Sequence, residues 1–128
     1  MNDKILLVDD EVSILVLLEE VLILEGFTIL TATNVKEGFR LAKQCHPFLL
    51  LTDLKLQNGI DGATLAGQVK RENPYIVSIA ITGHLSSFDK GYLLGSVFTD
   101  ILLKPIDNEL LLKVVHYAQD KYERWRSY

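Results

Sequence analysis

Residues that could bind a metal ion or a phosphoryl group follow four short apolar segments of the sequence. Each segment has the length and composition of a buried strand, and one of them, Phe48–Thr52, begins with four consecutive apolar residues. The polar residues that follow the four segments are Asp9-Asp10, Asp53, Thr82 and Lys104-Pro105. In open α/β sheets, ligands bind beyond the carboxyl ends of the strands. We therefore expect these residues to meet in one site.

The three carboxylates expected at this site favour a hard divalent cation. Carboxylates brought together repel one another and raise each other's pKa, which a bound cation relieves. A set of oxygen ligands without His or Cys favours Mg²⁺ over Zn²⁺. The ammonium of Lys104 and the hydroxyl of Thr82 suit the oxygens of a transferring phosphoryl group. Asp53 follows the central strand, and an aspartate can itself be the nucleophile in such a transfer.

An alternation of strands and helices must position these residues. The strands are expected at Lys4–Val8, Phe27–Ala32, Phe48–Asp53, Ile76–Ile81 and Thr99–Leu103. The helices are expected at Val12–Glu25, from Val35 to before Pro47, at Ala63–Glu72, from a Ser86 cap to Gly95, and from Asp107 onward. Gly26 is expected to end the first of these helices, and Asn34 to cap the second. Five such units predict an α/β fold with a doubly wound, five-stranded parallel sheet and five helices. The strand order 2-1-3-4-5 makes the first and third strands neighbours, and so brings Asp9, Asp10 and Asp53 together.

Length and composition restrict the class of protein. The 128 residues suffice for one domain with a real core, and we expect a single domain over residues 1–128. The net charge of -4 and the lack of a basic run argue against direct nucleic-acid binding. The apolar stretch Val12–Leu24 contains Glu19 and Glu20 and is too short for a membrane span. A single cysteine, Cys45, and no cleavable signal fit a cytoplasmic protein.

The whole pattern resembles the receiver domain of bacterial two-component response regulators. The resemblance rests on Asp9-Asp10, Asp53, Thr82 and Lys104-Pro105, each after a predicted strand and in the same order, and it covers essentially the whole chain. It implies the flavodoxin-like receiver fold and a phosphorylation-controlled switch. Such a domain catalyses only its own phosphorylation and dephosphorylation and is not a metabolic enzyme.

The resemblance also implies the acceptor and the metal ligands. Asp53 would take the phosphoryl group from a phosphohistidine on a sensor histidine kinase or phosphotransfer protein. Asp10 and Asp53 would bind Mg²⁺ directly, Asp9 would act largely through water, and the backbone carbonyl of Lys55 would be a further ligand. The output domain or partner is not specified by these residues.

Other positions bear on phosphoryl binding and signalling. By resemblance, Thr82 and Lys104 would hold phosphoryl oxygens, and the Lys104-Pro105 bond would be cis. Lys55 and His84 would lie on opposite rims of the site, where long side chains could slow hydrolysis. The switch position three residues before the lysine, usually aromatic, is Ile101.

The turn-rich segment Gln57–Gly62 is expected to be a loop at the site, and smaller departures from the family pattern lie in this loop and just before the fifth strand. Gln57 stands where proline is usual, Asp61-Gly62 comes one residue late, and Val97-Phe98 replaces the usual Gly-Ala. None of these changes removes a chemical group from the site.

Three other interpretations use some of the same residues. Asp9-Asp10-Glu11 could be an acidic helix N-terminus, which the helix dipole favours. An aspartyl-phosphate phosphatase of the dehalogenase type also uses Asp, Thr, Lys and Mg²⁺, but carries a second Asp two residues after the nucleophile, where this chain has Lys55. A phosphorylation-independent pseudo-receiver usually lacks an acidic or lysine position, and this chain retains them all.

Overall fold

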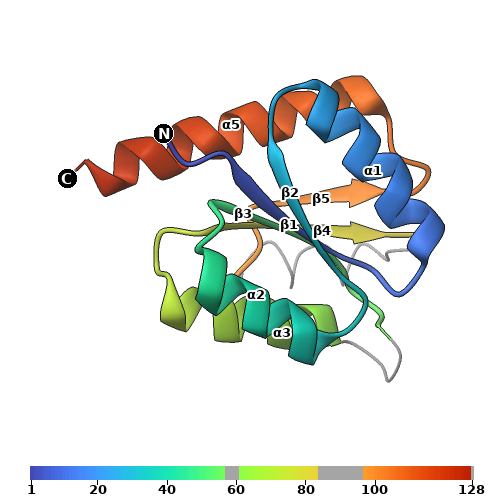
Figure 1. Cartoon of the computed structure of the whole chain (residues 1–128), viewed down its shortest axis with the longest axis horizontal. Helices are drawn as coiled ribbons and strands as arrows, with labels where there is room; N and C mark the ends of the chain where they lie inside the picture. The colour runs from blue at the N-terminus through green and yellow to red at the C-terminus, as the bar shows by residue number, and fades with distance from the viewer. Residues whose placement is uncertain (57–60, 84–96, 128) are drawn as a thin grey trace.

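The structure, a computed structural model, describes residues 1–56, 61–83 and 97–127. Strands and helices alternate along the chain (Figure 1). They are β1 (Lys4–Val8), α1 (Val12–Leu24), β2 (Thr28–Ala32), α2 (Val35–Cys45), β3 (Leu49–Asp53), α3 (Asp61–Glu72), β4 (Val77–Thr82), β5 (Asp100–Leu103) and α5 (Asn108–Arg126). The strands form one parallel sheet in the order β2-β1-β3-β4-β5. The predicted doubly wound α/β fold is confirmed.

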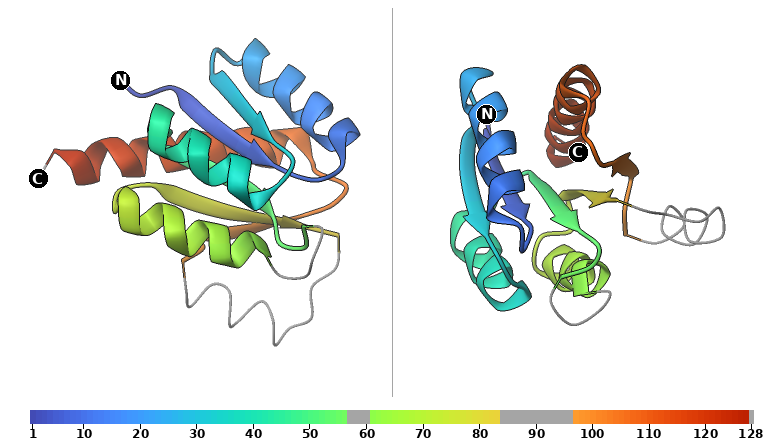
Figure 2. Two further views of the ribbon diagram at one scale, coloured as in Figure 1. Left: turned by 60° about the horizontal axis from the view of Figure 1, so that its bottom comes forward. Right: turned by 90° about the vertical axis from the view of Figure 1, so that its right-hand side faces the viewer.

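Helices cover both faces of the sheet. α1 and α5 lie on one face and α2 and α3 on the other (Figures 1 and 2). Because side chains alternate along a strand, β1 sends Ile5 and Leu7 into the core under α1 and α5, and Leu6 and Val8 into the core under α2 and α3. Every residue of β3 and β4 is buried, which explains the apolar run Leu49–Leu51 of β3 and the mainly apolar sequence of β4.

The predicted helix ends use the expected side chains. The side chain of Asn34 accepts a hydrogen bond from the Glu37 amide at 2.8 Å and caps α2. Asp107 caps α5 in the same way through the Glu109 amide, at 2.9 Å. α1 ends in a Schellman motif in which Gly26 has a φ of 104°, a conformation that glycine adopts without strain. Phe27, predicted as the first residue of the second strand, belongs to this motif instead, since its amide bonds to the Leu22 carbonyl at 3.1 Å.

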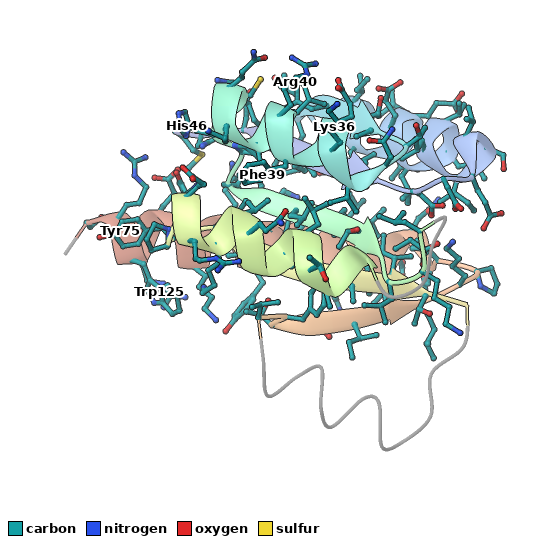
Figure 3. All side chains as sticks on the ribbon, turned by 90° about the horizontal axis from the view of Figure 1, so that it is seen from below. Lys36, Phe39, Arg40, His46, Tyr75 and Trp125 are labelled. Atoms are coloured by element: carbon teal, nitrogen blue, oxygen red, sulfur yellow. The ribbon has the colours of Figure 1, made fainter. Side chains whose placement is uncertain are left out.

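α2 shows how a surface helix divides its two faces. Gly38 and Ala42 are buried against the sheet and α3. Lys36 and Arg40 are exposed, and Figure 3 shows them pointing away from the sheet. Among the helices of the described residues, none combines the length and apolar character needed to span a membrane.

The start of α3 differs from the prediction. Asp61-Gly62 was expected to end a loop, but the helix begins at Asp61, and the Gly62 amide bonds to the Leu54 carbonyl at 3.1 Å. A Cβ at Gly62 would overlap the carbonyl oxygen of Asp53 and lie 2.9 Å from the Leu54 Cα. Glycine is therefore required here for the close approach of α3 to the end of β3 and not for a turn.

The other differences are at the margins of the described residues. The described residues contain four helices, and the predicted fifth, from Ser86 to Gly95, lies outside the described residues. Most of the predicted Gln57–Gly62 loop lies outside them as well.

Replacing Gly62 should destabilise the fold because the nearest atoms are backbone atoms that cannot move independently. We expect Gly62→Ala to lower the free energy of unfolding by about 3 kcal/mol, at the upper end of overpacking costs. Gly67, also in α3, is the matched control, since a Cβ there would meet nothing within 4 Å. Gly67→Ala should stabilise the protein by about 0.5–1 kcal/mol through helix propensity. Urea unfolding of both variants would measure the difference, and equal effects of the two would contradict it.

Candidate functional site

The sheet register brings the four chemical positions to one edge. Asp9 follows β1, Asp53 ends β3, Thr82 ends β4 and Lys104 follows β5. Backbone hydrogen bonds continue past the strands at this edge, from the Leu54 amide to the Ile81 carbonyl at 3.3 Å and from the Lys104 amide to the Thr82 carbonyl at 2.9 Å. The side chains are therefore placed by the sheet itself and not by a long loop.

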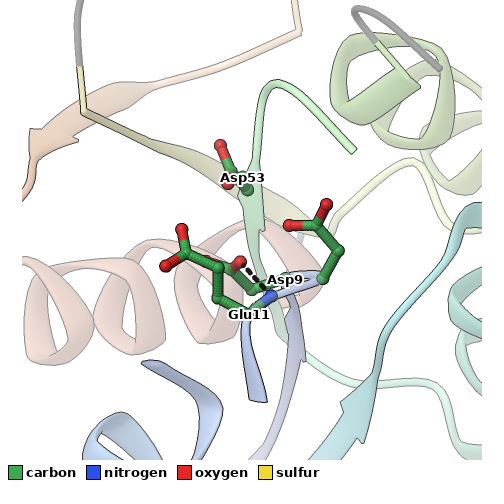
Figure 4. A group of neighbouring side chains, drawn as sticks. Asp9, Glu11 and Asp53 are labelled. Carbon is green, nitrogen blue, oxygen red and sulfur yellow. Dashed lines mark hydrogen bonds between the residues drawn. The ribbon is translucent and has the colours of Figure 1, made fainter. Parts of the chain in front are cut away.

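Four acidic side chains gather at this edge. Asp9, Asp10, Glu11 and Asp53 each contribute a carboxylate oxygen, and these oxygens all lie within 4.8 Å of one another. Figure 4 shows Asp9 and Glu11 just beyond β1, facing the end of β3 that carries Asp53. Asp9 and Asp53 are buried. Like charges this close repel one another, most strongly where water is excluded, so the arrangement favours a positive charge among them.

Lys104 supplies one positive charge to this cluster. Its Nζ lies 3.0 Å from Asp9 Oδ2, 3.1 Å from Asp53 Oδ2 and 3.3 Å from Glu11 Oε1. Partial burial alone would lower the pKa of Lys104, but the Asp9 and Asp53 carboxylates outweigh burial and raise its pKa well above the ordinary value. The ammonium is therefore charged at every physiological pH.

The Asp9 carboxylate is only partly compensated. Its Oδ1 accepts a hydrogen bond from the Glu11 amide at 2.9 Å. Its Oδ2 is buried, and its partner among the described residues is the ammonium of Lys104, an ion pair at 3.0 Å that Lys104 shares with Asp53 and Glu11. Burial, with the neighbouring Asp53 charge, raises the pKa of Asp9 above its ordinary value despite the opposing effects of the Glu11 amide and Lys104. A buried, under-compensated carboxylate oxygen among other carboxylates fits the coordination shell of a hard cation.

Asp53 is held from two sides. Its Oδ1 accepts a hydrogen bond from the Lys55 amide at 3.3 Å, and its Oδ2 accepts one from Lys104 Nζ at 3.1 Å. The residue is 7% exposed, so an incoming group can still reach it. The Lys55 side chain is exposed beside it, and the Lys104-Pro105 peptide bond is cis.

The proposed switch pair lies on the two neighbouring strands β4 and β5. Thr82 is buried, and Ile101 is partly buried and packs into the core under α2 and α3. Ile101 pairs with Ala80 in the sheet, two residues before Thr82, so strand alternation puts Ile101 and Thr82 on the same face. His84, the other predicted rim residue, lies outside the described residues.

Glu11 is a further member of the acidic cluster, and its sequence position indicates only an acidic helix N-terminus. It occupies the N-cap of α1, but its side chain makes no capping hydrogen bond. Its carboxylate instead contacts Lys104 from the far end of the chain. A third acidic residue directly after Asp9-Asp10 was the available signal.

Comparison with known protein families gives one match that covers most of the chain. The model described as the response regulator receiver domain matches residues 5–116. The transcriptional regulatory protein GlrR of Escherichia coli (strain K12) is 30% identical over 128 residues, which cover 96% of this chain and 29% of GlrR. Sporulation initiation phosphotransferase F of Bacillus subtilis (strain 168) is 32% identical over 99 residues, which cover 76% of this chain and 79% of that protein.

Solved structures give the same result. A CheY-like response regulator receiver domain protein from Methanospirillum hungatei JF-1 has a TM-score of 0.88 and 26% identity, over 97% of this chain and 98% of that one. The beryllofluoride-activated NtrC4 receiver domain dimer has a TM-score of 0.87 and 28% identity, over 94% and 98%. The chain spans less than a third of the length of GlrR, so the likeness to GlrR concerns one part of that longer regulator.

The raised pKa of Asp9 leads to a stability prediction. A carboxyl whose pKa is higher in the folded state disfavours folding when ionised, and that penalty disappears as the pH falls through the folded pKa. Asp9→Asn should therefore raise the free energy of unfolding of the metal-free protein at neutral pH, on the order of 1 kcal/mol. The difference from wild type should narrow as the pH is lowered. Urea unfolding at several pH values in the presence of a chelator would measure it.

The control for this prediction is Asp120→Asn. Asp120 is exposed on α5, roughly three helical turns from the end of that helix nearest the site. It should change stability little at any pH. A loss of stability in Asp9→Asn at neutral pH would contradict the interpretation of Asp9 as an under-compensated charge.

Proposed function

The chain belongs to the response regulator receiver domain family, and we propose that it is a phosphoacceptor switch of a two-component phosphorelay with Asp53 as the acceptor. One observation supports this most directly. The Asp53 carboxylate, at the end of the central strand, contacts the Lys104 ammonium at 3.1 Å and belongs to the same cluster as the carboxylates of Asp9 and Asp10. The acceptor thus has both a positive group and a group of possible cation ligands beside it.

In the proposed reaction, an oxygen of Asp53 attacks the phosphorus of a phosphohistidine. A P–O bond forms while the P–N bond to the donor imidazole breaks, and the imidazole nitrogen keeps the electron pair and takes up a proton. The Lys104 ammonium is 3.1 Å from Asp53 Oδ2. With little movement it can bind a phosphoryl oxygen on which negative charge develops during the transfer. Thr82, at the end of the adjacent strand, would donate a hydrogen bond from its hydroxyl to another phosphoryl oxygen.

Mg²⁺ is the cofactor that the donor set fits best. Asp10, Asp53 and the backbone carbonyl of Lys55 would hold it, with Asp9 acting largely through water. When bound, Mg²⁺ neutralises charge on the phosphoryl oxygens. The under-compensated Oδ2 of Asp9 supports a cation at this position.

The alternatives predict different chemistry at two positions. A dehalogenase-type phosphatase needs a general acid two residues after the nucleophile, and that residue is Lys55, whose amide bonds to Asp53. Turnover of external substrates is therefore disfavoured, and the only reactions we propose are phosphorylation of Asp53 and its later hydrolysis. A pseudo-receiver would bind partners without phosphorylation, which the labelling experiment below tests.

The proposed donor is a sensor histidine kinase or a phosphotransfer protein. The output is open, because relatives such as GlrR are transcriptional regulators more than three times the length that the match covers. We also predict that Lys55 slows hydrolysis of the phosphoryl group, since its side chain is exposed and Lys55 lies two residues after the acceptor.

Phosphorylation of Asp53 is directly testable. Incubation with Mg²⁺ and acetyl phosphate should give one phosphoryl adduct by intact-mass spectrometry, and peptide mapping should locate it on Asp53. Asp53→Asn should abolish the adduct because the amide is a poor nucleophile, and chelation of Mg²⁺ should reduce wild-type labelling at least tenfold. Asp120→Asn, which removes an exposed carboxylate on α5, should label normally. Labelling that survives in Asp53→Asn would overturn the assignment.

A second prediction concerns the switch position. Ile101 is β-branched and has neither a ring nor a hydroxyl, so it cannot follow Thr82 by a large rotation. Beryllofluoride should therefore change amide chemical shifts mainly around Thr82 and Gly83. In Ile101→Tyr, whose ring can extend from this partly exposed position, the changes should spread along β5 and into α5.

Ile101→Leu is the control, since it adds neither ring nor hydroxyl. It should respond like the wild type. A wild-type response across β5 and α5 that is as large as that of Ile101→Tyr would refute the prediction.

A further inference from the structure

Glu11 makes an interaction that its local position does not require. An N-cap residue normally accepts a hydrogen bond from an amide in the first turn, which short side chains such as Asp, Asn and Ser do best. The Glu11 side chain makes no such bond to α1. Its Oε1 instead accepts a hydrogen bond at 3.3 Å from Lys104 Nζ, 93 positions along the chain. The contact thus joins the start of α1 to the segment after β5.

Glu11 differs from the other two partners of Lys104. Asp9 Oδ2 and Asp53 Oδ2 lie 3.0 and 3.1 Å from Nζ, and both carboxylates belong to the proposed magnesium site. The ammonium of Lys104 and a bound cation therefore compete for the same oxygens. Glu11 is outside the proposed ligand set, and its side chain is 59% exposed, so it can hold the ammonium at the rim while the other two carboxylates face the cation.

We propose that Glu11 is a positioning residue that keeps Lys104 beside the acceptor when Mg²⁺ engages Asp9 and Asp53. This inference rests on the proposed function, because it assumes Mg²⁺ at the acidic site. By offering the ammonium an alternative partner, Glu11 reduces the competition of Lys104 with the metal and raises metal affinity. It also keeps the ammonium within reach of the phosphoryl oxygens that Lys104 must contact.

A direct effect of Glu11 on the metal is the main rival explanation. Its carboxylate lies within 4.8 Å of those of Asp9, Asp10 and Asp53, so it could act as a ligand or simply add negative charge. The two explanations differ in their dependence on Lys104. An effect through Lys104 disappears when the ammonium is removed, whereas a direct effect on the ion remains.

A double-mutant cycle read out as Mg²⁺ affinity separates these explanations. MgCl₂ is titrated by calorimetry, at constant ionic strength, into wild type, Glu11→Gln, Lys104→Met and the double variant. We expect Glu11→Gln to weaken Mg²⁺ binding about fivefold, the upper range for an exposed ion pair. In the Lys104→Met background the same change should have no effect. Equal weakening in both backgrounds, or no weakening in the wild-type background, would overturn the proposal.

Glu11→Asp tests the same point without changing Lys104. The net charge is unchanged, but the carboxylate is one methylene shorter and loses the 3.3 Å contact. Binding should weaken nearly as much as in Glu11→Gln, and wild-type affinity in Glu11→Asp would show that charge alone suffices and refute the positioning role. Glu20→Gln, an equal charge change at an exposed position of α1, should leave affinity unchanged.

The same titrations separate the failure of this inference from the failure of the proposed function. If wild type and every variant fail to bind Mg²⁺, the proposed metal site is wrong and the role of Glu11 is wrong with it. If wild type binds Mg²⁺ and Glu11→Gln binds equally well, only the role of Glu11 is wrong.

Discussion

Lys104 lies among the carboxylates of Asp9, Glu11 and Asp53, and its single ammonium offsets the repulsion created by burying two of these acids. Removing charges from water is expensive unless they are paired, and one ammonium cannot fully compensate several carboxylates. The raised pKa of Asp9 and its buried Oδ2 both indicate that the negative charge of the site exceeds its positive charge. The site is thus strained electrostatically in a way that favours a further cation.

The fold maintains this arrangement through the sheet. β1 and β3 are neighbours because the chain reverses its winding direction at this point, and their register aligns Val8 with Thr52. Asp9 and Asp53 follow those two positions, so strand pairing fixes the backbone positions of both acids. The approach of Gly62 to the Asp53 carbonyl packs the start of α3 directly against the acceptor. Rigid backbone on both sides is the kind of support that keeps a reactive group oriented.

Much of the fold could be predicted because its signals are local. The apolar run Leu49–Leu51 indicated a strand buried on both faces, and Asn34, Asp107 and Gly26 marked helix ends where the structure has them. The start of α3 was predicted wrongly because an Asp-Gly pair is typical of a turn. Whether Gly62 allows a turn or a close contact depends on where the end of β3 packs against it. A local sequence pattern does not contain that information.

The sequence alone determined which residues could carry the chemistry, and it showed that each of them follows a strand. Both could be predicted because the apolar pattern that marks a strand depends only on residues close together in the chain. That was enough to predict the α/β fold and to group Asp9, Asp10, Asp53, Thr82 and Lys104. Only the tertiary structure decided how the charges pair. Glu11 and Lys104 are 93 positions apart, and their contact exists because the ends of β1 and β5 share one edge of the sheet. Charge pairing depends on distances of a few ångströms between segments remote in sequence, so the role of Glu11 follows from the folded structure and not from its neighbours in the chain.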